Sequence, residues 1–188
     1  MKWFFIVLVL LFATVTPAQD GLKKIQNKYS SLNDFSVSFK QSGTGNSSGK
    51  VTFKKGNKLR IEMNNLTIVS DGTTVWSYNR RDDKVIISQF DEEDPSVLSF
   101  NRFVFDYPAA ATVSYVGNTV VLTGKPSADF KKAVLTPDSN NLLTKVELTD
   151  KSNKTTVFEF SNYKTNAGVG DSQFTFNPGQ GTTIVDLR

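Results

Sequence analysis

The sequence predicts a mainly β protein, and two patterns support this prediction. Short segments alternate apolar and polar side chains, with Gly, Asn and Asp turns between them. Two short stretches with helical spacing accompany these strands, one before them and one in their middle. An antiparallel sheet of about eleven strands has to curl or close to bury its apolar face. We therefore expect an incomplete, half-open β-barrel with a lid of short α-helices.

The first 18 residues have the layout of a secretory signal peptide. A basic start at Met1-Lys2 precedes an apolar run from Trp3 to Ala13, and small residues lead up to Ala18. The alternative is a membrane anchor, but the run is about half of the ~20 residues that a spanning helix needs. We expect cleavage after Ala18, export to the periplasm, and one monomeric domain over residues 19–188.

The helix expected after the signal begins near Asp20, a suitable N-cap. Its apolar residues recur at three- and four-residue steps and form one narrow stripe. They are Leu22, Ile25, Tyr29 and Leu32. A helix this short is marginal alone, so its stripe should pack on the sheet.

The strands follow in two series that we expect to pair as an antiparallel meander. The first series covers 34–40, 50–54, 58–63, 66–70, 75–79 and 85–87. The second covers 112–116, 119–123, 133–136, 142–148 and 155–163, with closing strands near 174–176 and 182–186. Between 66–70 and 75–79 stands Asp71-Gly72, a strong hairpin signal. Trp76 and Tyr78 share one face of the strand that follows.

A second helix is expected over residues 96–105. Asp94 is a suitable N-cap, Pro95 suits the first helical position, and the acidic run 91–94 favours the positive helix end. This helix is apolar on more than one side, with Val97, Leu98, Phe100, Phe103 and Phe105. It is expected either to cover the mouth of the curled sheet or to fill an ordinary core.

Composition narrows the functional classes. The chain has no Cys and no His, so disulfides, thiol nucleophiles, the common zinc sites and a Ser-His-Asp triad are excluded. We expect neither catalysis, nor a cofactor, nor a metal. The formal net charge is +4, with basic residues concentrated between Lys50 and Arg60. This cluster is read as a solvated outer face or, alternatively, as a surface for an anionic partner. No motif indicates nucleic-acid binding.

Four segments resemble a known family. They are Ser70-Asp71-Gly72-x-x-x-Trp76-x-Tyr78, residues 34–41, residues 49–63 and residues 174–186. Taken in their order along the chain, they resemble the periplasmic outer-membrane lipoprotein carriers, the LolA-like family. The resemblance implies an incomplete barrel whose cavity holds acyl chains of lipoproteins. It also implies an inner-membrane ABC-type release complex as donor and, where one exists, an outer-membrane acceptor.

The resemblance also implies roles for individual residues. The expected acyl-chain cavity comprises Phe35, Val37, Phe39, Leu59, Ile61, Trp76 and Tyr78. The expected lid comprises Val97, Leu98, Phe100 and Phe103. The chain departs from the family in two places. The family commonly has an Arg-Pro pair where this chain has Lys55-Gly56, so Lys55 is the expected lid latch. The segment after the middle helix also looks short. The alternatives are a filled core, a lipid-binding envelope sensor, or a glycolipid or phospholipid shuttle.

Overall fold

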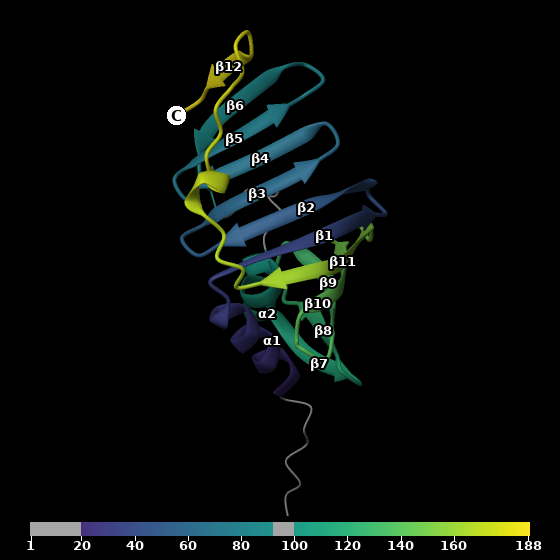
Figure 1. Cartoon of the computed structure of the whole chain (residues 1–188). Helices are drawn as coiled ribbons and strands as arrows, with labels where there is room; N and C mark the ends of the chain where they lie inside the picture. The colour runs from purple at the N-terminus through teal and green to yellow at the C-terminus, as the bar shows by residue number, and fades with distance from the viewer. Residues whose placement is uncertain (1–19, 92–99) are drawn as a thin grey trace, which may run out of the picture.

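The computed structural model describes residues 20–91 and 100–188, and within them a single sheet of twelve strands dominates (Figure 1). The strand order is β12-β6-β5-β4-β3-β2-β1-β11-β10-β9-β8-β7. The first series comprises β1 (Asp34–Ser42), β2 (Ser47–Lys54), β3 (Lys58–Met63), β4 (Leu66–Asp71), β5 (Thr74–Asn79) and β6 (Lys84–Gln89). The second comprises β7 (Ala111–Val116), β8 (Thr119–Gly124), β9 (Phe130–Pro137), β10 (Leu143–Asp150), β11 (Thr155–Thr165) and β12 (Thr183–Asp186).

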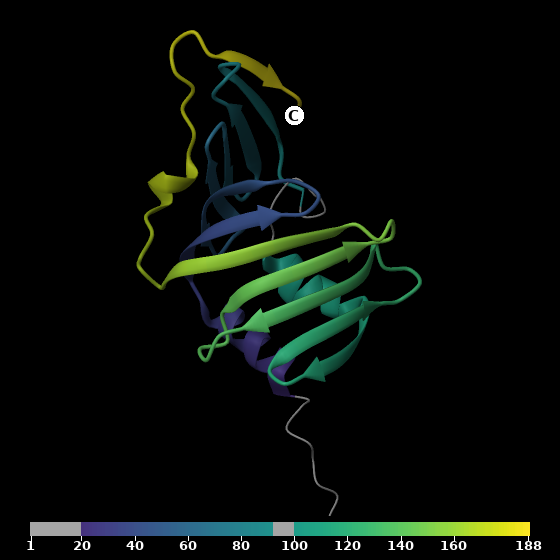
Figure 2. The same cartoon turned by 90° about the vertical axis from the view of Figure 1, so that its right-hand side faces the viewer.

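The sheet is curved and open, which confirms the expected fold class. Consecutive hairpins build β1–β6 and β7–β11, and antiparallel pairing of β1 with β11 joins the two series. The strand order begins at β12 and ends at β7, so the barrel does not close (Figures 1 and 2). A β-bulge in β11 shifts its register against β1 at Asn162, which has a φ of 57°. Such bulges bend a strand and increase its twist.

Two expectations about the C-terminal part were wrong. The predicted strand at 174–176 is absent, because Phe174 ends a 3₁₀ turn, η3 (Asp171–Phe174), and no strand follows until β12. The last strand also does not continue an antiparallel meander: β12 pairs in parallel with β6. Pairing between segments so distant in sequence leaves no local pattern that predicts it.

Helical segments pack on the concave side of the β7–β11 half. Helix α1 (Asp20–Ser31) buries Ile25 and Tyr29 of the expected stripe, and Leu32 follows it into the core. The second helical segment is described from Phe100 onward and continues as η2 (Arg102–Asp106) and α2 (Tyr107–Ala109). It therefore runs past the expected end at residue 105, while residues 96–99 of the predicted helix lie outside the described residues.

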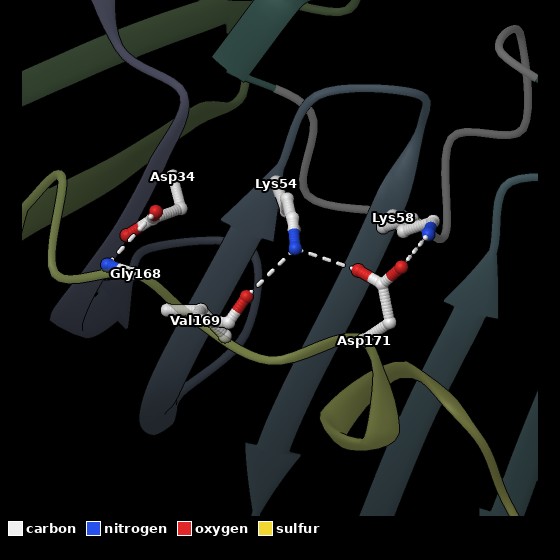
Figure 3. Close-up of polar contacts among 6 residues, drawn as sticks. All are labelled: Asp34, Lys54, Lys58, Gly168, Val169 and Asp171. Atoms are coloured by element: carbon white, nitrogen blue, oxygen red, sulfur yellow. Dashed lines mark hydrogen bonds and ion pairs between the residues drawn. The ribbon is translucent and has the colours of Figure 1, made fainter.

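The C-terminal strap, residues 166–188, crosses the opposite, convex face (Figure 1). The Asp34 carboxylate accepts the N–H groups of Ala167 and Gly168. Lys54 Nζ donates to the Val169 carbonyl at 2.8 Å and to Asp171 at 2.6 Å, and Lys58 Nζ lies 2.9 Å from the same carboxylate (Figure 3). Part of the basic cluster thus holds the strap instead of simply facing solvent.

Candidate functional site: the aromatic concave face

The concave face is lined by buried apolar residues from neighbouring strands. The register sets Val37 opposite Val51, Val51 opposite Ile61, and Ile61 opposite Ile68. Directly opposed residues lie on the same face of a sheet. All four are at most 3% exposed. This row forms the floor of the candidate site.

Five of the seven expected cavity residues lie on this face and are buried in one core cluster. They are Phe35, Val37, Phe39, Leu59 and Ile61. The register explains their proximity: Leu59 lies opposite Phe53, and Phe53 lies opposite Phe35. The alternation read from the sequence thus gathers these five on one surface.

Trp76 and Tyr78 lie on the convex face instead, so the structure does not bring them to the other five. Ile68 opposes Ser77, while Val69 opposes Trp76. Because side chains alternate along a strand, a one-residue offset exchanges the two faces. The Tyr78 ring lies 5.2 Å from that of Phe176 in the strap, between ring centroids. Strap residue Phe174 is 1% exposed, so this face has a second apolar core.

The second helical segment presents aromatic rings to the concave face. Phe100 has its ring centroid 5.0 Å from Phe35 and 4.9 Å from Phe160. Phe103 lies 5.5 Å from Phe158. Both expected lid residues that the structure describes therefore point into the concave side; Val97 and Leu98 lie outside the described residues.

Several aromatic residues of the site were missed from the sequence. Tyr107 and Phe130 have ring centroids 4.6 Å apart, and Phe158 and Phe160 line the opposite part of the cluster. The last two alternate on the predicted strand 155–163, so their period could have revealed them. Phe130 precedes the predicted strand 133–136 and gave no comparable signal.

Lys55, the expected latch, is exposed in the turn after β2. Its backbone N–H donates to the Asn33 carbonyl at 2.9 Å. No hydrogen bond or ion pair of its side chain occurs within residues 20–91 and 100–188. The neighbouring Lys54 makes the side-chain contacts, and these hold the strap. The latch role of Lys55 stays a prediction.

A polar network joins α1 to β10 and β11 inside the apolar cluster. The hydroxyls of Tyr29 and Tyr163 are 3.0 Å apart and hydrogen-bond to each other. Tyr29 also accepts the Leu143 N–H at 3.1 Å, and Tyr163 donates to the Leu143 carbonyl at 2.8 Å. Both backbone groups of Leu143 are thereby satisfied by tyrosine hydroxyls, at a position where β10 does not pair with β11. Removing such a partner from a buried group costs about 1–3 kcal/mol.

This network predicts that the folded protein loses stability at high pH. Burial raises the pKa of Tyr29 from 10.0 to about 12, and burial also raises the pKa of Tyr163. A raised folded-state pKa stabilises the fold below the unfolded value, and this contribution disappears as pH rises from 10 through 12. We expect the melting temperature to fall over this range, and less steeply in Tyr29→Phe/Tyr163→Phe. Equal slopes in circular-dichroism melts would contradict the prediction.

Comparison with known proteins settles the family. The family model described as outer membrane lipoprotein carrier protein LolA matches residues 30–177, which include the strands β1–β11. The chain belongs to the LolA family. It is 26% identical over 203 residues to the outer-membrane lipoprotein carrier protein of Francisella tularensis subsp. tularensis (strain WY96-3418), covering 99% of this chain and 98% of that protein.

A second relative in sequence and one solved structure add to this comparison. The carrier protein of Haemophilus influenzae (strain PittEE) is 28% identical over 203 residues, with 98% of this chain and 96% of that protein covered. An uncharacterized conserved protein from Thermus thermophilus shares the fold, with a TM-score of 0.59 at 11% identity. The match covers 89% of this chain and 98% of that one. Among the described residues, no helix has the length and apolar character to cross a membrane.

Proposed function

We propose that this LolA family member is a periplasmic carrier that holds the acyl chains of lipoproteins against its concave face. It takes them from the inner membrane and delivers them to the outer membrane. The observation that carries the proposal is the buried aromatic face beneath the second helical segment, in a chain whose relatives are named lipoprotein carriers. The proposed acyl-contacting residues are Phe35, Val37, Phe39, Leu59 and Ile61 on the strands.

The contact between helix and sheet is suited to exchange for a lipid. Phe100 and Phe103 meet the sheet through aromatic rings. Dispersion contacts of this kind are non-directional, so acyl chains can take the place of these two rings. Two polar contacts that also hold the segment are Gln26 Nε2 to the Val104 carbonyl at 3.0 Å and Arg102 to Asp129 at 2.6 Å. The helix is thus suited to act as a lid that acyl chains displace.

The energetics set what a carrier has to do. Each CH₂ group removed from water contributes about 0.8 kcal/mol, so exposing one 16-carbon chain to water costs roughly 12 kcal/mol. The concave face has to offset most of this and still release the chain. Displacing rings that already fill the site lowers net affinity, which favours release. The donor is proposed to be an ABC-type release complex, and the cargo acylated lipoproteins.

Lipid analysis and a release assay test the proposal together. We expect mass spectrometry of the protein isolated from its native periplasm to identify acylated lipoprotein, and the purified protein to solubilise lipoproteins from inner-membrane vesicles. Extraction of only phospholipid or glycolipid, without release of lipoprotein, would favour the shuttle alternative. Absence of lipid together with no release would contradict the carrier function and leave the envelope sensor.

A further inference from the structure

Strands β10 and β11 separate beside the aromatic cluster, by which we mean the rings of Phe35, Phe100, Phe103, Phe158 and Phe160 on the concave side. Their paired register ends where Lys145 opposes Glu159, although β11 continues to Thr165 alongside β1. A cavity of about 570 Å³ lies in this gap, and α1 contributes Lys28 to its lining. In Figure 2 the purple helix α1 lies behind the green strands of this half of the sheet. We call this cavity the side pocket; Lys28, Leu142, Thr144, Phe160, Ser161 and Tyr163 are among its lining residues.

Local contacts keep the two strands apart. The bulge at Asn162 turns its side-chain amide toward Ser38 on β1, at 3.4 Å. On the other side, the Thr144 hydroxyl donates to the Thr136 carbonyl on β9 at 3.0 Å. The Leu143 carbonyl accepts a hydrogen bond from the Tyr163 hydroxyl, and not from the backbone of β11. The gap is therefore built into the hydrogen bonding of the fold.

The lining changes from apolar inside to polar at the mouth. Phe160 is 5% exposed and belongs to the aromatic cluster, with its ring centroid 4.9 Å from that of Phe100. Ser161 and Asn162 are exposed at the rim, and Lys28 contributes a cation. The pocket's acidic group, Asp138, already accepts the N–H groups of Asn140 and Leu142 at 2.8 Å each. Neutral hydrogen-bonding groups predominate at the mouth.

We infer that the side pocket binds the polar junction of an acylated ligand, the ester and amide carbonyls next to the acyl chains. The chains lie against Phe160 and the aromatic cluster, while hydroxyl and amide donors at the rim meet the carbonyl oxygens. This inference rests on the proposed function and extends it. It predicts that the protein distinguishes a lipopeptide from a simple fatty acid, because only the former carries several uncharged carbonyl groups at this junction.

A single engineered thiol tests the side pocket. The chain has no Cys, so Ser161→Cys supplies a unique thiol at the rim, and Ser48→Cys is a matched exposed control on β2. Each variant is reacted with a maleimide alone, with a triacylated Cys-Ser-Lys lipopeptide, or with palmitate. We expect the lipopeptide to slow labelling of Ser161→Cys about tenfold, the effect of one or two hydrogen bonds holding the junction over the thiol. Palmitate, and either ligand with Ser48→Cys, should change labelling less than about twofold.

Displacement of a fluorescent fatty acid separates the two possible failures. If both ligands displace the probe but the lipopeptide leaves Ser161→Cys labelling unchanged, the side-pocket inference is wrong and the carrier function stands. If neither displaces it, both are wrong. A second variant, Ser161→Trp, obstructs the mouth; it should weaken lipopeptide binding about tenfold and leave palmitate binding unchanged. Equal binding of the lipopeptide by wild type and Ser161→Trp would also overturn the inference.

Discussion

Leu59→Glu is expected to reduce acyl-chain affinity by more than about a hundredfold at neutral pH. Leu59 is 6% exposed on the concave face, opposite Phe53. An ionised carboxylate against hydrocarbon costs several kcal/mol. In the lipid-free protein this cost is smaller if the helix can separate and admit water. Fluorescent fatty-acid titrations and urea unfolding, performed in parallel, should therefore show a greater loss of binding than of folding free energy.

Two control variants sharpen this prediction. Leu59→Gln has nearly the same shape without the charge, and it should retain more binding than Leu59→Glu at neutral pH. Trp76→Glu places the charge on the convex face, where it should affect stability but not acyl-chain binding. Lowering the pH should restore binding by Leu59→Glu, because the protonated carboxyl is neutral. Parallel loss of binding and folding in Leu59→Glu would favour a sealed core.

Phe100→Ala is expected to lower the free energy of unfolding by about 3–5 kcal/mol, as for other large buried aromatic residues. Phe100 is 6% exposed, and its ring lies within 6.3 Å of four others, between centroids. Urea unfolding monitored by circular dichroism would measure the change. Phe105→Ala, at a partly buried position of the same segment, is the matched control and should cost less.

A double-mutant cycle relates this loss to the helix–sheet contact. Phe35→Ala and Phe100→Ala remove the two rings of a 5.0 Å edge-to-face pair, so their effects should not be additive. Such aromatic pairs contribute about 0.5–1.5 kcal/mol beyond buried area. A coupling energy of zero, or a Phe100→Ala cost below about 1 kcal/mol, would show that the segment is not held by this cluster.

The sequence by itself determined most of the elements and much of the site. Alternation located the strands of β1–β11, and helical spacing located Ile25, Tyr29 and Leu32 on one side of α1. Alternation also gathered the five concave residues, because residues two apart on a strand share a face regardless of long-range contacts. The missing Cys and His removed whole classes of chemistry without any structural information.

Only the tertiary structure decided which face of β5 is concave. Val75 and Trp76 stand on opposite sides of this strand, and both sides carry apolar residues, so periodicity gives no preference. The ambiguity arises because the strap covers the convex face and buries Phe174 there. The pairing of β1 with β11 and of β12 with β6 likewise joins segments far apart in the chain. Such pairings, and the gap between β10 and β11, depend on how the whole sheet curves, which local patterns do not encode.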